Sequence, residues 1–171
     1  TLQIGIGSLG DAIAQALIVR ERHSVEYRRI LESICADGLK GRDLGTFEKG
    51  LYGCSEMFVN GFLKLMQAGV IRREVFGDAV LQQLINKGAI APESITPETL
   101  RVLLDVGRVR SPLAQEDLNF LQRFGIVRAG ATLDGETLVL GDKRCSTNLL
   151  QDDAFACVCT NMLGSRLTGG I

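Results

Sequence analysis

The chain has 171 residues, of which 46% are hydrophobic and 23% charged, and its net charge is −1. This balance is typical of a globular protein with a hydrophobic core, and the absence of tryptophan means that aliphatic side chains must fill most of that core. The lack of a basic surplus argues against nucleic acid as the main partner, and no apolar stretch approaches the roughly 20 residues of a membrane span.

The two ends of the sequence suggest a longer protein. The chain opens at Thr1, inside an apolar strand pattern, and closes at Ile171, just after two glycines where a strand would begin. We therefore expect an excerpt of a longer chain. No charged leader with an apolar core opens the sequence, which predicts a cytoplasmic location.

The cysteines and the single histidine predict no metal site. The five cysteines are an odd number without a CxxC pair, which favours reduced, mostly buried thiols in a cytosolic protein. One histidine, His23, cannot supply a His-based metal cluster or a Ser-His-Asp triad within the chain. We expect His23 to have a surface or helix-capping role.

The first part of the chain alternates between strand and helix patterns. The predicted elements are, in order, a strand at 2–6, a helix capped by Ser8 or Asp11, a helix at 25–35, a loop at 36–50, a strand at 51–57 and a helix at 58–68. The last of these helices carries Phe62, Leu65 and Met66 on its predicted buried face, and Gly69 ends it.

Residues 58–128 contain a weak internal repeat, in which a short apolar helix ends at a glycine and an apolar exit follows. The four segments are FLKLMQAGVI, LQQLINKGAI, LRVLLDVGRV and LNFLQRFGIV. Their glycines (Gly69, Gly88, Gly107 and Gly125) are expected at helix C-termini, in the left-handed conformation that costs glycine little. We interpret the repeat as stacked helical hairpins without chemistry of their own; the alternative is a helix array that binds a partner.

The last part of the chain returns to strand patterns. The pair Asp134-Gly135 suits a tight turn, so we predict a hairpin over 131–140, with a further helix over 154–163. Strands, then helices, then strands predict an α/β fold with a helical insertion. The predicted divisions are an α/β core segment at 1–71, a helical insertion at 72–128 and a truncated return to the α/β core at 129–171.

The sequence GIGSLG at residues 5–10 matches the GxGxxG pattern of dinucleotide sites, between a predicted strand and a predicted helix. Such a site also needs a second strand that ends in an acidic residue about 20 positions on, and residues 23–29 have a helical pattern instead. Three interpretations stay open: a nicotinamide or flavin dinucleotide site, backbone amides presented to a developing oxyanion, and a purely structural turn.

Two separated blocks resemble a known family. The block LYGCSEMFVNG at 51–61, followed by LMQAGVI at 65–71, is similar to the strand, Ser/Thr-Glu pair and helix of the acetyl-CoA hydrolase/transferase family. The glycine turn and the helix after it match the upstream block of that family, so the resemblance covers residues 1–20 and 50–71. It implies a parallel-sheet, CoA-transferase-like domain portion with coenzyme A as substrate.

The resemblance implies that Glu56 is the catalytic nucleophile, because the Glu of the Ser-Glu pair has that role in the family. Its carboxylate attacks an acyl-CoA to give an acyl-glutamyl anhydride and then a glutamyl-CoA thioester, which a carboxylic acid or water resolves. A carboxylate needs placement and desolvation to react in this way, and a strand end that faces a cleft can provide both.

The supporting residues come from the same resemblance. The candidate oxyanion donors and CoA-proximal residues are Gly7, Ser8, Leu9 and Gly10, through their backbone amides. Ser55 and Asn60 are expected to support the nucleophile, and Asn60 stands where the family usually has Asp. The implied partners are an acyl-CoA and a small carboxylic acid, with no metal, nucleic acid or membrane, and a homodimer is left open.

The chain departs from the compact family members in two ways. Its helical stretch at 72–128 is longer, and the late glycine-rich loop that contacts CoA in the family has no counterpart before Ile171. We therefore expect no transferase activity from this chain alone. The alternatives are an NAD(P)-binding oxidoreductase domain that uses GIGSLG and a non-enzymatic helical interaction module. The acyl group and the choice between acid and water as acceptor stay open.

Overall fold

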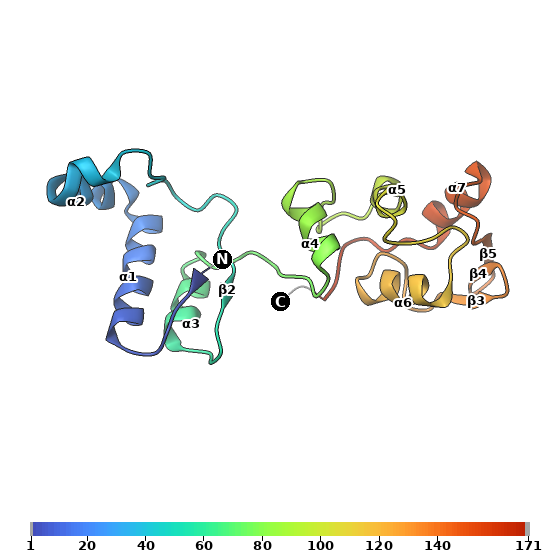
Figure 1. Cartoon of the computed structure of the whole chain (residues 1–171). Helices are drawn as coiled ribbons and strands as arrows, with labels where there is room; N and C mark the ends of the chain where they lie inside the picture. Colours follow the sequence, from blue (N-terminus) through green and yellow to red (C-terminus); the bar gives the residue numbers. More distant parts are fainter. Residues whose placement is uncertain (1, 170–171) are drawn as a thin grey trace. The chain divides into compact units, whose positions relative to one another are not determined.

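The computed structural model describes residues 2–169, apart from the side chain of Ala36. The contacts divide the chain into two compact units, Thr1–Glu74 and Val75–Ile171, each with its own hydrophobic cluster (Figure 1). Helices mix with one small parallel and one small antiparallel sheet, which agrees with the coarse prediction of a mixed helix and strand fold. Thr1 and Ile171, on which the prediction of an excerpt depends, lie outside the described residues.

The first unit is built around a parallel strand pair. Its elements are β1 (Leu2–Gln3), α1 (Ser8–Arg22), α2 (Ser24–Cys35), the 3-10 helix η1 (Ala36–Leu39), β2 (Gly53–Cys54) and α3 (Asn60–Gln67). Leu2 pairs with Gly53 and Gln3 with Cys54, and an isolated parallel bridge joins the chain just before β2 to the segment after α3. Helices α1 and α3 pack against each other (Figure 1). Each predicted element is present, although both strands are shorter than predicted.

The core of the first unit is small and aliphatic except for one ring. Its buried members are Ile4, Ala14, Phe62, Leu65 and Val70. The predicted buried face of α3 is therefore correct for Phe62 and Leu65. It is wrong for the methionine that follows Leu65, which is 52% exposed.

Two arginines hold the long loop that leads into β2. The guanidinium of Arg72 donates to the backbone carbonyls of Gly69, Phe47 and Glu48. The Nε of Arg20, on α1, donates to the carbonyl of Gly45 at 2.7 Å, and its guanidinium carbon lies 4.2 Å from the centre of the Phe47 ring. The loop is thus tied to α1 and to the end of α3, which fixes the entry of the chain into β2.

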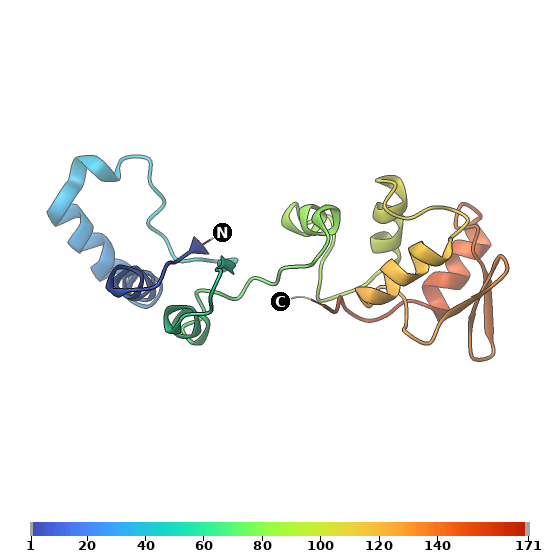
Figure 2. The ribbon, with the colours of Figure 1, turned by 60° about the horizontal axis from the view of Figure 1, so that its bottom comes forward.

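The second unit combines helices with an antiparallel sheet. Its elements are α4 (Ala79–Asn86), α5 (Pro97–Asp105), α6 (Gln115–Arg123), β3 (Thr132–Asp134), β4 (Thr137–Leu140), β5 (Lys143–Ser146) and α7 (Asp152–Asn161). The strands follow each other in the order β3-β4-β5, and β5 lies beside α7 (Figure 2). The predicted hairpin and final helix are confirmed, and β5 was not predicted. Among the described residues, no helix has both the length and the apolar character to cross a membrane.

The grouping of the last segment differs from the predicted division. Residues of β4, β5 and α7, such as Leu138, Cys145 and Val158, share one buried cluster with the helices α4 to α6. The strands pair with each other and not with β1 or β2. Among the described residues, the segment 129–169 therefore belongs with the helices before it.

The four repeated glycines all have the predicted left-handed conformation. Their φ angles are between 68° and 75°, and each follows the last residues of a helix, α3, α4, α5 or α6. In each repeat the residue after the glycine donates its N–H to the carbonyl of a leucine four residues before the glycine, as Arg108 does to Leu103 at 2.9 Å. An apolar residue one or two positions after the glycine is then buried, such as Val109. The repeat is thus a helix-ending motif that turns the chain back into the core.

The prediction of reduced cysteines is wrong for Cys145 and Cys157, and the prediction of burial is wrong for Cys35 and Cys54. Cys145 and Cys157 form a disulfide, because β5 and α7 pack side by side and bring the two Cα atoms to 5.7 Å. Cys35 and Cys54 are exposed free thiols, and Cys159 is a partly buried one. Pairing of residues 12 positions apart, between a strand and a helix, leaves no signal in the local sequence pattern.

Substitution of Gly107 tests the helix-ending motif. An added Cβ has open space there, so the cost of Gly107→Ala comes from the backbone conformation alone, and we expect a loss of about 1–2 kcal/mol in the free energy of unfolding. Gly107→Asn is the matched control and should lose less, because asparagine adopts the left-handed conformation more readily. Denaturant unfolding measures both variants, and equal losses, or none, would contradict the motif.

Candidate functional site

The parallel pairing of β1 and β2 brings two loops to one edge of the first unit. Both strands run in the same direction, so their carboxyl ends meet, and the segments that leave them enclose a hollow of about 220 Å³. Residues 3–6, at the end of β1 and in the loop after it, line one side of the hollow, and residues 55–57, in the loop after β2, line the other. The carboxyl end of parallel strands is the usual ligand-binding edge of open α/β sheets.

Glu56 lies in the wall of this hollow, in the turn that follows β2. The hydroxyl of Ser55 donates to the backbone carbonyl of Met57 and so closes the turn across Glu56. The Glu56 side chain is exposed. Glu56 thus lies at a strand end and beside a hollow, and the described residues of this unit do not remove the carboxylate from water.

The glycine turn contributes to the hollow with residues earlier than those predicted. Gly5 and Ile6 line it, while the predicted donors at positions 7–10 adjoin it in the chain and are outside the lining set. Helix α1 begins at Ser8, with the residue before it as N-cap, and its first intrahelical bond runs from the Asp11 N–H to the Gly7 carbonyl at 3.1 Å. The backbone amides of positions 8–10 are therefore in the first turn of a helix, where N–H groups lack intrahelical acceptors.

Gly10 lets α1 approach β1 closely. A Cβ at this position would overlap the carbonyl oxygen of Gly5 and would lie 2.8 Å from the Cγ2 atom of Ile4. The third glycine of GIGSLG is thus required for packing between the helix and the strand end. This is the structural interpretation that the sequence left open for that position.

Gly53 has the same function on the second strand. A Cβ there would overlap the ring of Phe62, which is buried on α3. The ring packs directly onto the backbone of β2 and so fixes the strand from which the Ser55–Glu56 turn departs. The two close approaches, at Gly10 and Gly53, hold the two walls of the hollow.

The remaining predicted site residue, Asn60, is the first residue of α3. It is exposed and is outside the set that lines the hollow. Sequence reasoning missed five lining residues, namely residues 3–6 and Met57. Their positions next to the carboxyl ends of β1 and β2 are the signal that could have found them, once the two strands were assumed to pair in parallel.

The hollow has an apolar rim. Ile6 and Met57 line it and are 73% and 60% exposed, and Phe58, the next residue along the chain, is 72% exposed. Large apolar side chains this exposed at one loop cluster favour contact with a ligand or with another protein surface.

The region between α1 and β2 bears on the dinucleotide interpretation. It contains α2, η1 and a loop, so no strand is described over residues 23–50 and no acidic strand end follows the glycine turn at the expected distance. The feature that holds the ribose in a Rossmann unit is therefore missing from this segment.

The described groups with a shifted pKa are Asp78, Arg110 and Cys159, all of which are in the second unit. Burial acts to raise the pKa of Asp78, but hydrogen bonds from Arg108 and from the Leu81 N–H, with the Arg108 charge, hold it below its ordinary value. Asp78 is the N-cap of α4, so this ion pair joins two repeats. The described residues contain no group of three or more His, Cys, Asp or Glu side chains that could hold a metal ion.

Comparisons with protein-family models, with curated proteins and with solved structures find no match to this chain.

The close packing at Gly10 can be tested by stability. Alanine in place of glycine inside a helix normally gains about 1 kcal/mol, but Gly10→Ala forces a Cβ into the Gly5 carbonyl, so we expect a net loss of about 1–3 kcal/mol. Gly5→Ala is the control, because nothing lies within 4 Å of its added Cβ, and it should change the free energy of unfolding by less than about 0.5 kcal/mol. A stabilised Gly10→Ala variant would contradict the described approach of α1 to β1.

Proposed function

We propose that this chain supplies the nucleophilic carboxylate, Glu56, of a CoA-transferase or acyl-CoA hydrolase. The observation that carries the proposal is the shared hollow. The Ser55–Glu56 turn and the glycine turn are about 50 residues apart in sequence, and both belong to the resemblance to the acetyl-CoA hydrolase/transferase family; residues of both line one hollow.

The position of the hollow also supports the proposal. It lies at the carboxyl ends of two parallel strands, and the N-terminus of α1 begins two residues after the lining residue Ile6. N–H groups at a helix N-terminus favour negative charge nearby, such as the oxyanion that forms when a nucleophile attacks a thioester carbonyl. In this scheme Ser8, Leu9 and Gly10 donate through their backbone amides.

The reaction follows from carboxylate chemistry. A Glu56 oxygen attacks the acyl-CoA carbonyl, the carbon–sulfur bond breaks, and CoA leaves as a thiolate with an acyl-glutamyl anhydride on the protein. The thiolate then attacks the glutamyl carbonyl of the anhydride and releases the acyl group as a carboxylate. A second carboxylate repeats these steps in reverse and takes up CoA, or water hydrolyses the glutamyl thioester.

The exposure of Glu56 has a consequence for this scheme. A solvated carboxylate is a weak nucleophile, so the water around it must be displaced when the substrate binds. The apolar side chains of Ile6 and Met57 are in position to exclude water from one side of the carboxylate when an acyl group occupies the hollow. The choice between acid and water as acceptor then depends on how completely the bound state is closed.

The alternatives find less support. The dinucleotide interpretation depends on a second strand with an acidic end, and that part of the first unit is helix and loop. The helical repeat that suggested an interaction module consists of helix ends whose apolar residues are directed into the cores of the two units. The CoA proposal accounts for the glycine turn and for the Ser-Glu pair together.

Trapping of the covalent intermediate tests the proposal. The longest natural chain that contains this sequence is mixed with acetyl-CoA and borohydride, which reduces a glutamyl thioester to an alcohol, and its peptides are mapped by mass spectrometry. We expect the modification on Glu56, and we expect Glu56→Gln to abolish it and to lower CoA transfer or hydrolysis by roughly 10³-fold or more.

The control is Glu48→Gln, which removes another exposed glutamate from the same unit and should leave the modification and the rate unchanged. Modification of a different carboxylate, or an unchanged rate for Glu56→Gln, would contradict the assignment of the nucleophile.

A further inference from the structure

The disulfide of the second unit joins two elements that are already in contact. Cys145 is on β5 and Cys157 is on α7, and their Cα atoms are 5.7 Å apart, inside the normal range for a disulfide. The two elements pack against each other. The thiols therefore stay close to each other whether or not they are bonded, and the bond can form again without rearrangement of the fold.

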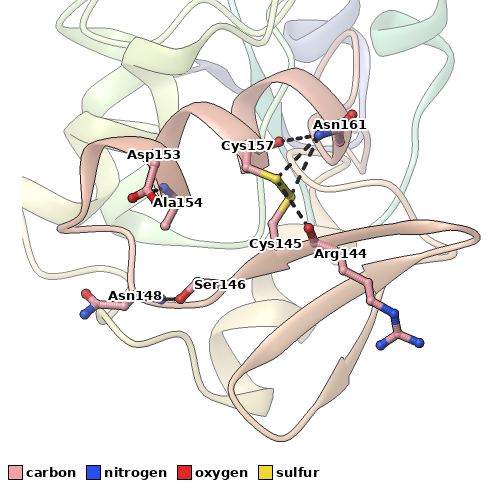
Figure 3. The surroundings of a disulfide bond; sticks show 8 residues. All are labelled: Arg144, Cys145, Ser146, Asn148, Asp153, Ala154, Cys157 and Asn161. Carbon is pink, nitrogen blue, oxygen red and sulfur yellow. Dashed lines mark hydrogen bonds between the residues drawn. A yellow bond between two sulfur atoms is a disulfide. The ribbon is translucent and has the colours of Figure 1, made fainter.

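The two cysteines differ in exposure. Cys145 is only 3% exposed and belongs to the core of the unit, whereas Cys157 is partly exposed on α7. The Asn161 amide donates to the Cys157 carbonyl at 3.0 Å and lies 3.5 Å from the Cys157 sulfur and 3.9 Å from the Cys145 sulfur (Figure 3). The greater exposure of Cys157 favours attack of a dissolved thiolate there, and the amide is near both sulfur atoms, including Cys145, which would leave as a thiolate.

The third cysteine of this unit does not attack the bond. Cys159 is two residues after Cys157 on α7, and residues two apart do not face each other on a helix. Burial raises the pKa of the Cys159 thiol, and the nearby charge of Arg101 lowers it only in part. Cys159 is therefore a poor nucleophile, so the thiol that opens the disulfide comes from outside this unit.

We propose that Cys145 and Cys157 are a reversible redox pair, which a small dissolved thiol such as glutathione opens through Cys157. The glutathione thiolate attacks the Cys157 sulfur, the sulfur–sulfur bond breaks, and Cys145 leaves as a thiolate that takes up a proton. A second glutathione thiolate attacks the glutathione sulfur of the mixed disulfide and releases Cys157. The protein disulfide gains two electrons, and two glutathione molecules become one molecule of oxidised glutathione.

Reduction should loosen α7 without unfolding the unit. Ala154, Val158 and Met162 remain buried on or next to α7, and the Arg128 N–H donates to the Met162 carbonyl at 2.9 Å. The bond closes a short loop, so its loss should lower the melting temperature of the second unit by roughly 10–20 °C while its secondary structure stays the same. The Cys145–Cys157 pair would thus make the stability of this unit depend on the ratio of reduced to oxidised glutathione around it.

The test uses the full 171-residue chain in native buffer with graded mixtures of reduced and oxidised glutathione. Acid quenching, alkylation of free thiols and peptide mapping give the fraction of the 145–157 disulfide and the position of any glutathione adduct. We expect reversible opening, with the adduct on Cys157, and a lower melting temperature in the reduced protein.

Two variants complete the design. Cys159→Ser should keep the glutathione response, and Cys145→Ser should hold glutathione on Cys157 as a stable adduct. Opening only after denaturation, an adduct on Cys145 in the native chain, or failure of oxidised glutathione to restore the bond would each overturn the proposal.

Discussion

The parallel pairing of β1 with β2 is the constraint on which the proposed site depends. Because the strands are parallel and Leu2 pairs with Gly53, the carboxyl ends of both strands lie at one edge of the sheet. The glycine turn is therefore close to the turn that carries Glu56. Two close contacts, each made possible by a glycine, hold the strand pair. Helix α1 packs against the end of β1 at Gly10, and the Phe62 ring packs against β2 at Gly53. With so few strand residues, these helix contacts determine where the two loops lie.

The second unit depends on another use of glycine. Three of the four repeated glycines are there, and each ends a helix in the left-handed conformation so that the next apolar residue enters the core. The ion pair between Asp78 and Arg108 joins the start of one repeat to the end of another, and the disulfide joins the sheet to α7. The glycines, the ion pair and the disulfide explain why the second unit is compact. None of them takes part in the proposed reaction.

Local patterns were sufficient for the elements and insufficient for the contacts between them. The helices, the four helix-ending glycines and the turn at Asp134-Gly135 follow from spacing and from the conformational freedom of glycine. Strand β5 pairs with β4 across a turn at residues 141–142, and its short sequence carries no alternating pattern. The disulfide and the assignment of 129–169 to the second core depend on which segments pack together, which no local pattern encodes. For the site, the resemblance singled out Glu56 and the glycine turn, but the lining by Gly5 and Ile6 required the strand register.

A thiol cross-link across the strand pair tests this register most directly. Gln3 and the native thiol Cys54 are paired and exposed, so Gln3→Cys, with the other exposed thiol removed by Cys35→Ser, should give an efficient intramolecular cross-link to Cys54 with a short bifunctional reagent. Leu2→Cys in the same background places the thiol on the opposite face of the strand and should cross-link poorly. An inefficient cross-link from position 3, or equal yields from both positions, would contradict the pairing that joins the glycine turn to Glu56.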